Sequence, residues 1–298
     1  VDLSRNRWNC LVWLLTGGGA IFAAFPTVYA TVFSGFYLAI MLLLLALILR
    51  AVAIEFRSKV ESDRWRGWWD MAFGLGSSLA ALLFGVALGN LLRGIPLDAQ
   101  GNFSGDFVFL LNPYALLIGL VGLAMLATHG ALYIRLKSDG ELEVRARRWG
   151  TYAWVFYMVL FFVASVATIV GRPQLMTNYE HMPLLWAVPG MALCSMVSIG
   201  ILNLKDKPGV AFIASSFSIA LLMATVAAAM FPNLVPALEQ AGASLTLANS
   251  SSSQLTLKSM LILAIIGMPF VIFYTVWVHR AFAGKASTNG YAQSPNSE

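Results

Sequence analysis

Charged residues are scarce in this chain of 298 residues. Only 11% of the residues are Asp, Glu, Lys or Arg, whereas 59% are hydrophobic, and the mean hydropathy is +0.75. A soluble globular domain typically carries about 25% charged residues. A chain this apolar has no solvated face to offer to water, so its composition excludes an ordinary soluble protein and favours an integral membrane protein.

Cysteine and histidine are also rare. The two cysteines, Cys10 and Cys194, lie in or beside apolar segments and form neither a metal-ligand spacing nor a disulfide framework. We interpret them as small hydrophobic residues. The sequence contains no Gly-rich phosphate loop, zinc motif or nucleophile elbow in a suitable context. The residues therefore predict no metal site and no catalytic centre within this chain.

Long apolar runs dominate the sequence instead. Each is about as long as the roughly 20 residues that a helix needs to cross a bilayer. Residues 13–59 hold two such runs joined by a short elbow that contains Pro26, which predicts a membrane hairpin. We expect an all-α polytopic membrane protein, with one helical domain over residues 1–285 and a disordered cytoplasmic tail at 286–298. The eight expected spans are 11–32, 35–55, 68–93, 113–136, 150–171, 184–204, 208–231 and 257–280.

The net charge of +5 indicates an orientation rather than a nucleic-acid partner. Lysine and arginine gather in every second loop, as the positive-inside rule describes. The rule therefore predicts that both ends of this chain lie in the cytoplasm. The basic residues after the second, fourth, sixth and eighth spans are Arg57, Lys59, Arg64, Arg66, Arg135, Lys137, Arg145, Arg147, Arg148, Lys205, Lys207, Arg280 and Lys285.

Ionisable residues in or beside the spans are the candidate functional residues, because such residues are costly in lipid. Arg50 and Glu55 lie near the cytoplasmic end of the second span, and Asp70 opens the third. Interfacial anchoring by snorkelling explains them. A place in a proton or quinone path is the alternative, and the residues alone leave both interpretations open.

One histidine, His129, lies inside an expected span, and His279 lies at the end of the last one. Haem iron takes axial ligands such as His or Met, so His129 is a candidate haem ligand with His279 as its partner. The commoner role of a lone polar residue in a span is to hold helices together, and we favour that role.

A series of motifs resembles the second subunit of cytochrome bd quinol oxidases. The resemblance covers nearly the whole chain, and the motifs occur in the family's order. They are VWLLTGGGAIFAAFP (12–26), YATVFSGFYL (29–38), FRSK (56–59), WRGWWD (65–70), GVALGNLLRGIPL (85–97), LLNPYALL (110–117), GELEVRAR (140–147), SSSQLTL (251–257) and YTVW (274–277).

The resemblance implies a function within a complex of the bacterial inner membrane. That complex oxidises quinol and reduces dioxygen to water, and it is electrogenic without pumping protons. Its larger subunit I carries two haems b and one haem d. The subunit that this chain resembles binds no haem, stabilises the haem arrangement and lines dioxygen and proton routes. Some members bind a structural quinone. Membrane lipid and, in some complexes, a small single-span subunit are further partners.

Two departures from the family pattern concern the N-terminal part. The family has nine spans, and this sequence begins just before the second of them, so it resembles a form without the first helix. The family also places an acidic residue just before its Val-Trp-Leu motif, whereas residues 8–11 read Trp-Asn-Cys-Leu. A proton route through this position is therefore not expected. Trp13 matches the tryptophan of the family's proposed dioxygen channel and is our candidate for that route.

Two other classes of protein are consistent with the residues alone. A stand-alone transporter would hold polar residues and broken helices near the membrane midplane; within the expected spans, Pro189 and Pro269 are the prolines that offer such breaks. An assembly or lipid-binding factor would take no part in electron transfer. Co-purification with a haem-bearing partner separates an oxidase subunit from both.

Overall fold

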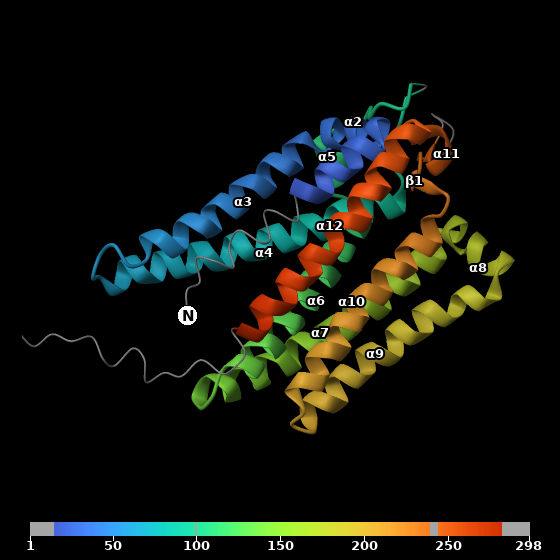
Figure 1. The fold of residues 1–298 in the computed structure, drawn as a ribbon. Coiled ribbons are helices and arrows are strands. Elements are labelled where there is room, and N and C mark those ends of the chain that lie inside the picture. The colour runs from blue at the N-terminus through green and yellow to red at the C-terminus, as the bar shows by residue number, and fades with distance from the viewer. Residues whose placement is uncertain (1–14, 99, 239–243, 282–298) are drawn as a thin grey trace, which may run out of the picture.

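The computed structural model describes residues 15–98, 100–238 and 244–281, and nearly all of these are helical (Figure 1). The helices are Leu15–Ala24, α2 (Pro26–Gly35), α3 (Tyr37–Phe56), α4 (Asp63–Arg93), α5 (Phe107–Leu110), α6 (Pro113–Lys137), α7 (Glu141–Gly171), α8 (Thr177–His181), α9 (Ala187–Leu204), α10 (Pro208–Met230), α11 (Leu247–Ser250) and α12 (Gln254–Ala281). Two 3-10 helices, η1 (Pro173–Met176) and η2 (Pro183–Trp186), and two strands, β1 (Asn233–Val235) and β2 (Leu245–Thr246), complete the described elements.

The expected all-α membrane fold is confirmed. Seven helices within the described ranges are long and apolar enough to cross a membrane, and Leu15–Ala24 is a shorter apolar helix. The expected span 11–32 is divided in the structure, since α2 begins at Pro26 directly after Phe25. Proline has no N–H to donate and disfavours a helical conformation in the residue before it. These two properties account for the break.

The helix α7 extends further than expected. It begins at Glu141, although the hydropathy pattern predicts a start at residue 150. Glu141 and Glu143 occupy its first turn, where negative charge favours the positive end of the helix dipole. The charged segment is therefore helical without being apolar, and hydropathy alone does not detect it.

The long helices pack as neighbours, α3 beside α4, α4 beside α6, α6 beside α7 and α10, and α9 beside α10. A close approach of backbones joins α4 and α6. A Cβ atom added to Gly85 would lie 2.7 Å from the Cα of Gly119, and one added to Gly89 would lie 2.7 Å from the Cα of Ala115. A larger residue in place of either α4 glycine would push the two backbones apart, so glycine sets this contact.

The connections at one end of the molecule form a packed cap. We call this the loop-rich end; among the described residues it comprises 94–98, 100–112, 172–186, 231–238 and 244–253, near the labels α5, α8, β1 and α11 (Figure 1). Its apolar core contains Ile95 and Leu97, which are fully buried. The other buried members of this core are Val28, Phe36, Leu110, Val235 and Leu245.

A buried amide pair fastens the cap to the helices. Asn90, which is 1% exposed, donates to the carbonyl oxygens of Val86 at 2.9 Å and Leu110 at 2.8 Å. It accepts from the side chain of Asn112 at 2.9 Å, and Asn112 also accepts from the backbone N–H of Ala115 at the start of α6. Because each buried polar group finds a partner, this pair orders α4, α5 and α6 instead of destabilising them.

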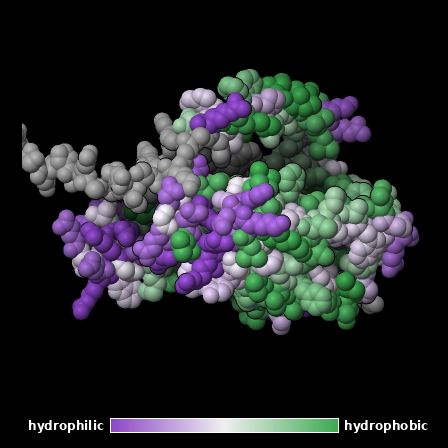
Figure 2. All heavy atoms as spheres, turned by 90° about the horizontal axis from the view of Figure 1, so that it is seen from below, coloured by the Kyte–Doolittle hydropathy of each residue, from purple (hydrophilic) through white to green (hydrophobic). Residues whose placement is uncertain are grey.

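The turns at the opposite end carry the basic loops, so we call it the arginine-rich end. It holds the α3–α4, α6–α7 and α9–α10 turns. Figure 2 shows hydrophilic side chains gathered over part of the face seen from below, with apolar side chains over much of the rest. A membrane protein needs such a separation, because its charged groups must reach the water on either side of the lipid.

Candidate functional site

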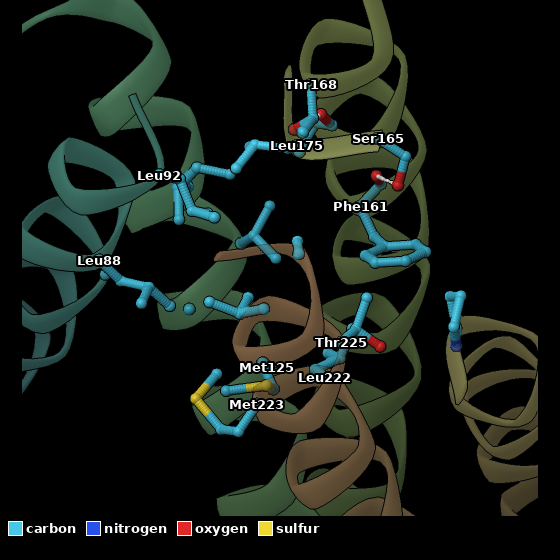
Figure 3. Close-up of a pocket in the computed structure, with 18 of the residues that line it drawn as sticks. Leu88, Leu92, Met125, Phe161, Ser165, Thr168, Leu175, Leu222, Met223 and Thr225 are labelled. Atoms are coloured by element: carbon cyan, nitrogen blue, oxygen red, sulfur yellow. Dashed lines mark hydrogen bonds between the residues drawn. The ribbon is translucent and has the colours of Figure 1, made fainter. Parts of the chain in front are cut away.

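A cavity of about 510 Å³ lies between α4, α6, α7 and α10, and the cap segments η1 and α8 bound it. Figure 3 shows apolar side chains from several helices pointing into it. The lining includes Leu88, Ile118, Met125, Phe161, Leu222 and Val226. Such a lining suits a hydrocarbon chain rather than a polar substrate.

Few polar groups border the cavity, and most are already paired. The hydroxyls of Ser165, Thr168 and Thr225 donate to backbone carbonyl oxygens of their own helices. The Tyr179 hydroxyl donates to the carbonyl oxygen of Thr225 at 2.8 Å, and burial raises the pKa of this hydroxyl. Tyr179 therefore stays protonated at neutral pH. The cavity therefore offers space for binding. None of these four hydroxyl groups is placed to transfer a proton.

A charged network forms a second polar site at the arginine-rich end. Arg135 at the end of α6 has a side chain that is 2% exposed. Its Nη1 donates to the carbonyl oxygen of Asn203 at 2.8 Å and to the side-chain oxygen of Asn203 at 2.6 Å, and its Nη2 pairs with Asp206. Glu143 on α7 lies 3.7 Å from its Nε. One guanidinium thus connects α6, α7 and the α9–α10 turn.

Residues of α7 also contact the α9–α10 turn. Arg147 pairs with Asp206 at 2.9 Å and donates to the carbonyl oxygen of Leu204 at 3.1 Å. The side chain of Asn203 donates to the Thr151 hydroxyl at 3.0 Å. Asp206 has a positive φ of 56°, a conformation that few residues other than Gly, Asn and Asp adopt. The turn therefore presents one carboxylate to two arginines.

From the sequence, Arg135 and Arg147 indicate only the orientation of the chain, and their part in this network is not predicted. The signal that points to it is the carboxylate of Asp206 between Lys205 and Lys207 in an otherwise basic turn. That signal does not identify a partner, because Asp206 and Arg135 are 71 residues apart.

The ionisable candidates near the second and third spans lie apart from the cavity. Asp70 accepts from Arg57 through both of its oxygens, at 2.6 Å and 3.1 Å, and this pairing raises the pKa of the Arg57 guanidinium. Arg50 lies over the ring of Phe73, 5.7 Å from its centroid. Glu55 is exposed near the end of α3. The structure thus brings Asp70 to Arg57, but it places Arg50 against an aromatic ring.

His129 packs between α6 and α10. Its Nδ1 lies 3.1 Å from the Ser215 hydroxyl, and its ring stacks on Phe212 with centroids 4.5 Å apart. Both contacts join α6 to α10, which is the role that a lone polar residue commonly has in a membrane span. No group of three His, Cys, Asp or Glu residues that would hold a metal ion occurs in the described ranges.

Two candidates cannot be placed. Trp13 lies outside the described residues, and the side chain of His279 is likewise not described. The dioxygen-route role of Trp13 and the pairing of His129 with His279 stay predictions.

Comparisons with known proteins bear on this geometry. A family model described as cytochrome bd terminal oxidase subunit II matches residues 9–282. The cytochrome bd-I ubiquinol oxidase subunit 2 of Escherichia coli K12 is 34% identical in an alignment 316 positions long. The alignment covers 96% of this chain and 83% of that protein. This chain belongs to the cytochrome bd oxidase subunit II family.

Other relatives agree with that assignment. The cytochrome bd ubiquinol oxidase subunit 2 of Bacillus subtilis is 35% identical, and a probable cytochrome oxidase subunit 2 of Haemophilus influenzae is 36% identical. Each alignment covers 93% of this chain and 81% of the relative. The solved bd oxidase of Geobacillus thermodenitrificans matches with a TM-score of 0.72 and 17% identity, over 93% of this chain and 84% of that one. At this identity the structural match supports the fold.

The family assignment fixes the coarse identity of the molecule. The chain is an integral membrane subunit of an oxidoreductase complex, and as a second subunit it has a subunit I as its partner. The charged network and the cavity are features of this subunit's own structure.

Substitution of Arg135 tests the charged network. We expect Arg135→Gln to lower the free energy of unfolding by about 2–3 kcal/mol, because the change removes charge-assisted hydrogen bonds and leaves buried acceptors unpaired. Thermal unfolding of the detergent-solubilised protein measures the loss. Arg57→Gln is the matched control, because its ion pair with Asp70 is half exposed and screened by water. An equal loss in both variants would contradict the assigned importance of the buried network.

Proposed function

We propose that this chain is the haem-free companion of a haem-bearing subunit I, and that it supports quinol oxidation and dioxygen reduction by scaffolding that subunit. Membership of the subunit II family carries the proposal, since the model match spans residues 9–282. The relatives in Escherichia coli and Bacillus subtilis are named as subunits of ubiquinol oxidases, so quinol is the proposed electron donor. We further propose that the complex is electrogenic without pumping protons.

In this proposal, all haem chemistry takes place in subunit I. Haems b and d belong to subunit I in this proposal, and no step of electron transfer passes through a residue of this chain. A structural quinone, which the resemblance implies for some members, is a further proposed cofactor of the complex. A small single-span subunit is a further proposed partner, and purification of the complex tests its presence.

Co-purification with a haem protein tests the main proposal. We expect a tagged form of this chain, isolated in mild detergent from its native membrane, to bring down a partner with a red-shifted d-type absorption band. The same chain expressed alone should show no haem spectrum. Haem in the isolated chain would contradict the haem-free assignment. A pull-down without haem would instead favour a transporter or an assembly factor.

Routes for dioxygen and protons form the second part of the proposal. We assign Trp13 to the wall of the dioxygen route, on its match to the family motif. Arg50, Glu55 and Asp70 lie toward the arginine-rich end, the side on which protons would be taken up. Their surroundings are consistent with both a proton or quinone path and anchoring at the membrane surface.

Trp13→Ala tests the dioxygen route. Removing the indole should change the KM for dioxygen of the intact complex several-fold, because the width of a narrow apolar path depends on the side chains that line it. Trp13→Phe should retain most of the wild-type value, since it preserves an aromatic wall. Oxygen consumption at varied dioxygen concentration measures both variants. An unchanged KM in Trp13→Ala, with the complex intact, would remove Trp13 from the route.

The proposed orientation places both ends of this chain, and with them the arginine-rich end, in the cytoplasm of a bacterial inner membrane. Three basic turns at the same end support it. A fluorescent protein that matures only in the cytoplasm, fused after Glu298, should therefore fluoresce. The same protein inserted between Asp98 and Gln100, at the opposite end, should not. The reverse pattern would contradict the orientation.

A further inference from the structure

One arginine at the loop-rich end forms no salt bridge with any described residue. The Arg93 guanidinium at the end of α4 lies over the ring of Phe109, 4.4 Å from its centroid. Its Nη1 is buried and makes no hydrogen bond to any described residue. A buried charged donor without an acceptor is costly, so this nitrogen calls for an acceptor that the described residues do not supply.

A second arginine reinforces the positive charge. Arg172 directly follows the last residue of α7, close enough for its charge to act on both Arg93 and Tyr114. The Tyr114 hydroxyl lies beside them, bonded to the Thr168 hydroxyl at 2.9 Å. Neither arginine forms a salt bridge with a described residue. Two cations that repel each other beside a hydroxyl favour an anion with several oxygen atoms.

The arginine pair is adjacent along the chain to residues that line one end of the apolar cavity, and neither arginine is itself part of the lining. Leu92, Thr168 and Leu175 line that end and lie together in Figure 3. Arg93 directly follows Leu92, and Arg172 lies between Thr168 and Leu175 along the chain. Other lining residues, Phe84 and Ile169 among them, are exposed at the surface of this chain. The cavity thus opens at that surface, and positive charge lies near its loop-rich end.

We propose that Arg93 and Arg172 bind the phosphate of an anionic phospholipid whose acyl chain occupies the cavity. Inorganic phosphate would satisfy the arginines but leave the apolar space unfilled. A quinone would fill the space and offer a carbonyl oxygen to Nη1 of Arg93, but it would bring no negative charge to balance the two arginines. A phospholipid does both, with its headgroup at the level of the membrane surface. This proposal stands on the geometry of the chain and does not depend on the proposed function.

Lipid retention tests the site. The full chain is purified with its co-purifying partners, stripped of lipid and mixed with phosphatidylglycerol or with net-neutral phosphatidylcholine; bound lipid is then counted by native mass spectrometry. We expect the wild type to retain phosphatidylglycerol preferentially, and Arg93→Gln/Arg172→Gln to bind it about ten-fold more weakly, as the loss of about one charge-assisted contact predicts. Arg148→Gln, an exposed arginine at the other end, is the matched control and should bind as the wild type does.

Further variants separate the headgroup from the chain. Val226→Phe narrows the cavity, so it should reduce lipid retention although both arginines remain. Arg172→Lys keeps the positive charge, so it should retain much more phosphatidylglycerol than Arg172→Gln does. If the double variant does not fold, Arg172→Gln carries the test, because Arg172 is partly exposed. Three results would overturn the proposal: wild-type retention in Arg172→Gln, a quinone displacing phosphatidylglycerol from the wild type, or equal thermal stabilisation by inorganic phosphate and by phosphatidylglycerol.

Discussion

The close contact between α4 and α6 is the constraint on which the rest of the structure depends. Lipid tails are as apolar as leucine, so helices in a membrane gain little from hiding apolar side chains and associate through close packing instead. Gly85 meets Gly119 where neither has a side chain to hold the backbones apart. The same contact places Asn90 within hydrogen-bonding distance of the carbonyl oxygen of Leu110. The contact also fixes one wall of the neighbouring cavity.

The helix α6 is fastened at both of its ends by buried polar groups. Asn112 begins it beside Asn90, and Arg135 ends it among Asn203 and Asp206. The chain has few charged residues, and Arg135 lies where it joins several elements at once. Between these two sets of polar contacts, α6 and its neighbouring helices need only match in shape, so a cavity is tolerated there. Polar order at the ends and apolar space in the middle are therefore two consequences of one arrangement.

Hydropathy and length predicted most of the membrane helices from the sequence because a spanning helix must bond its own backbone and face lipid. The expected span 208–231 corresponds closely to α10, Pro208–Met230, where proline begins the helix. The early start of α7 was missed because its first turns are charged. The Arg135–Asp206 pair was missed for another reason. Charge in a loop indicates orientation, but which distant charge it meets depends on how the turns pack, and no local pattern encodes that.

The last helix shows why a membrane sequence predicts spans better than contacts. None of the apolar window of α12 is buried inside the chain, although the helix is as hydrophobic as its packed neighbours. In water such exposure would be costly, but in lipid it is not, so hydrophobicity carries no information about which face meets protein. The segment before α12 is held through its backbone, by the Ser252 N–H donating to the carbonyl oxygen of Ala24 at 2.8 Å. Position at the membrane surface, rather than burial along the span, is what the chain specifies for this helix.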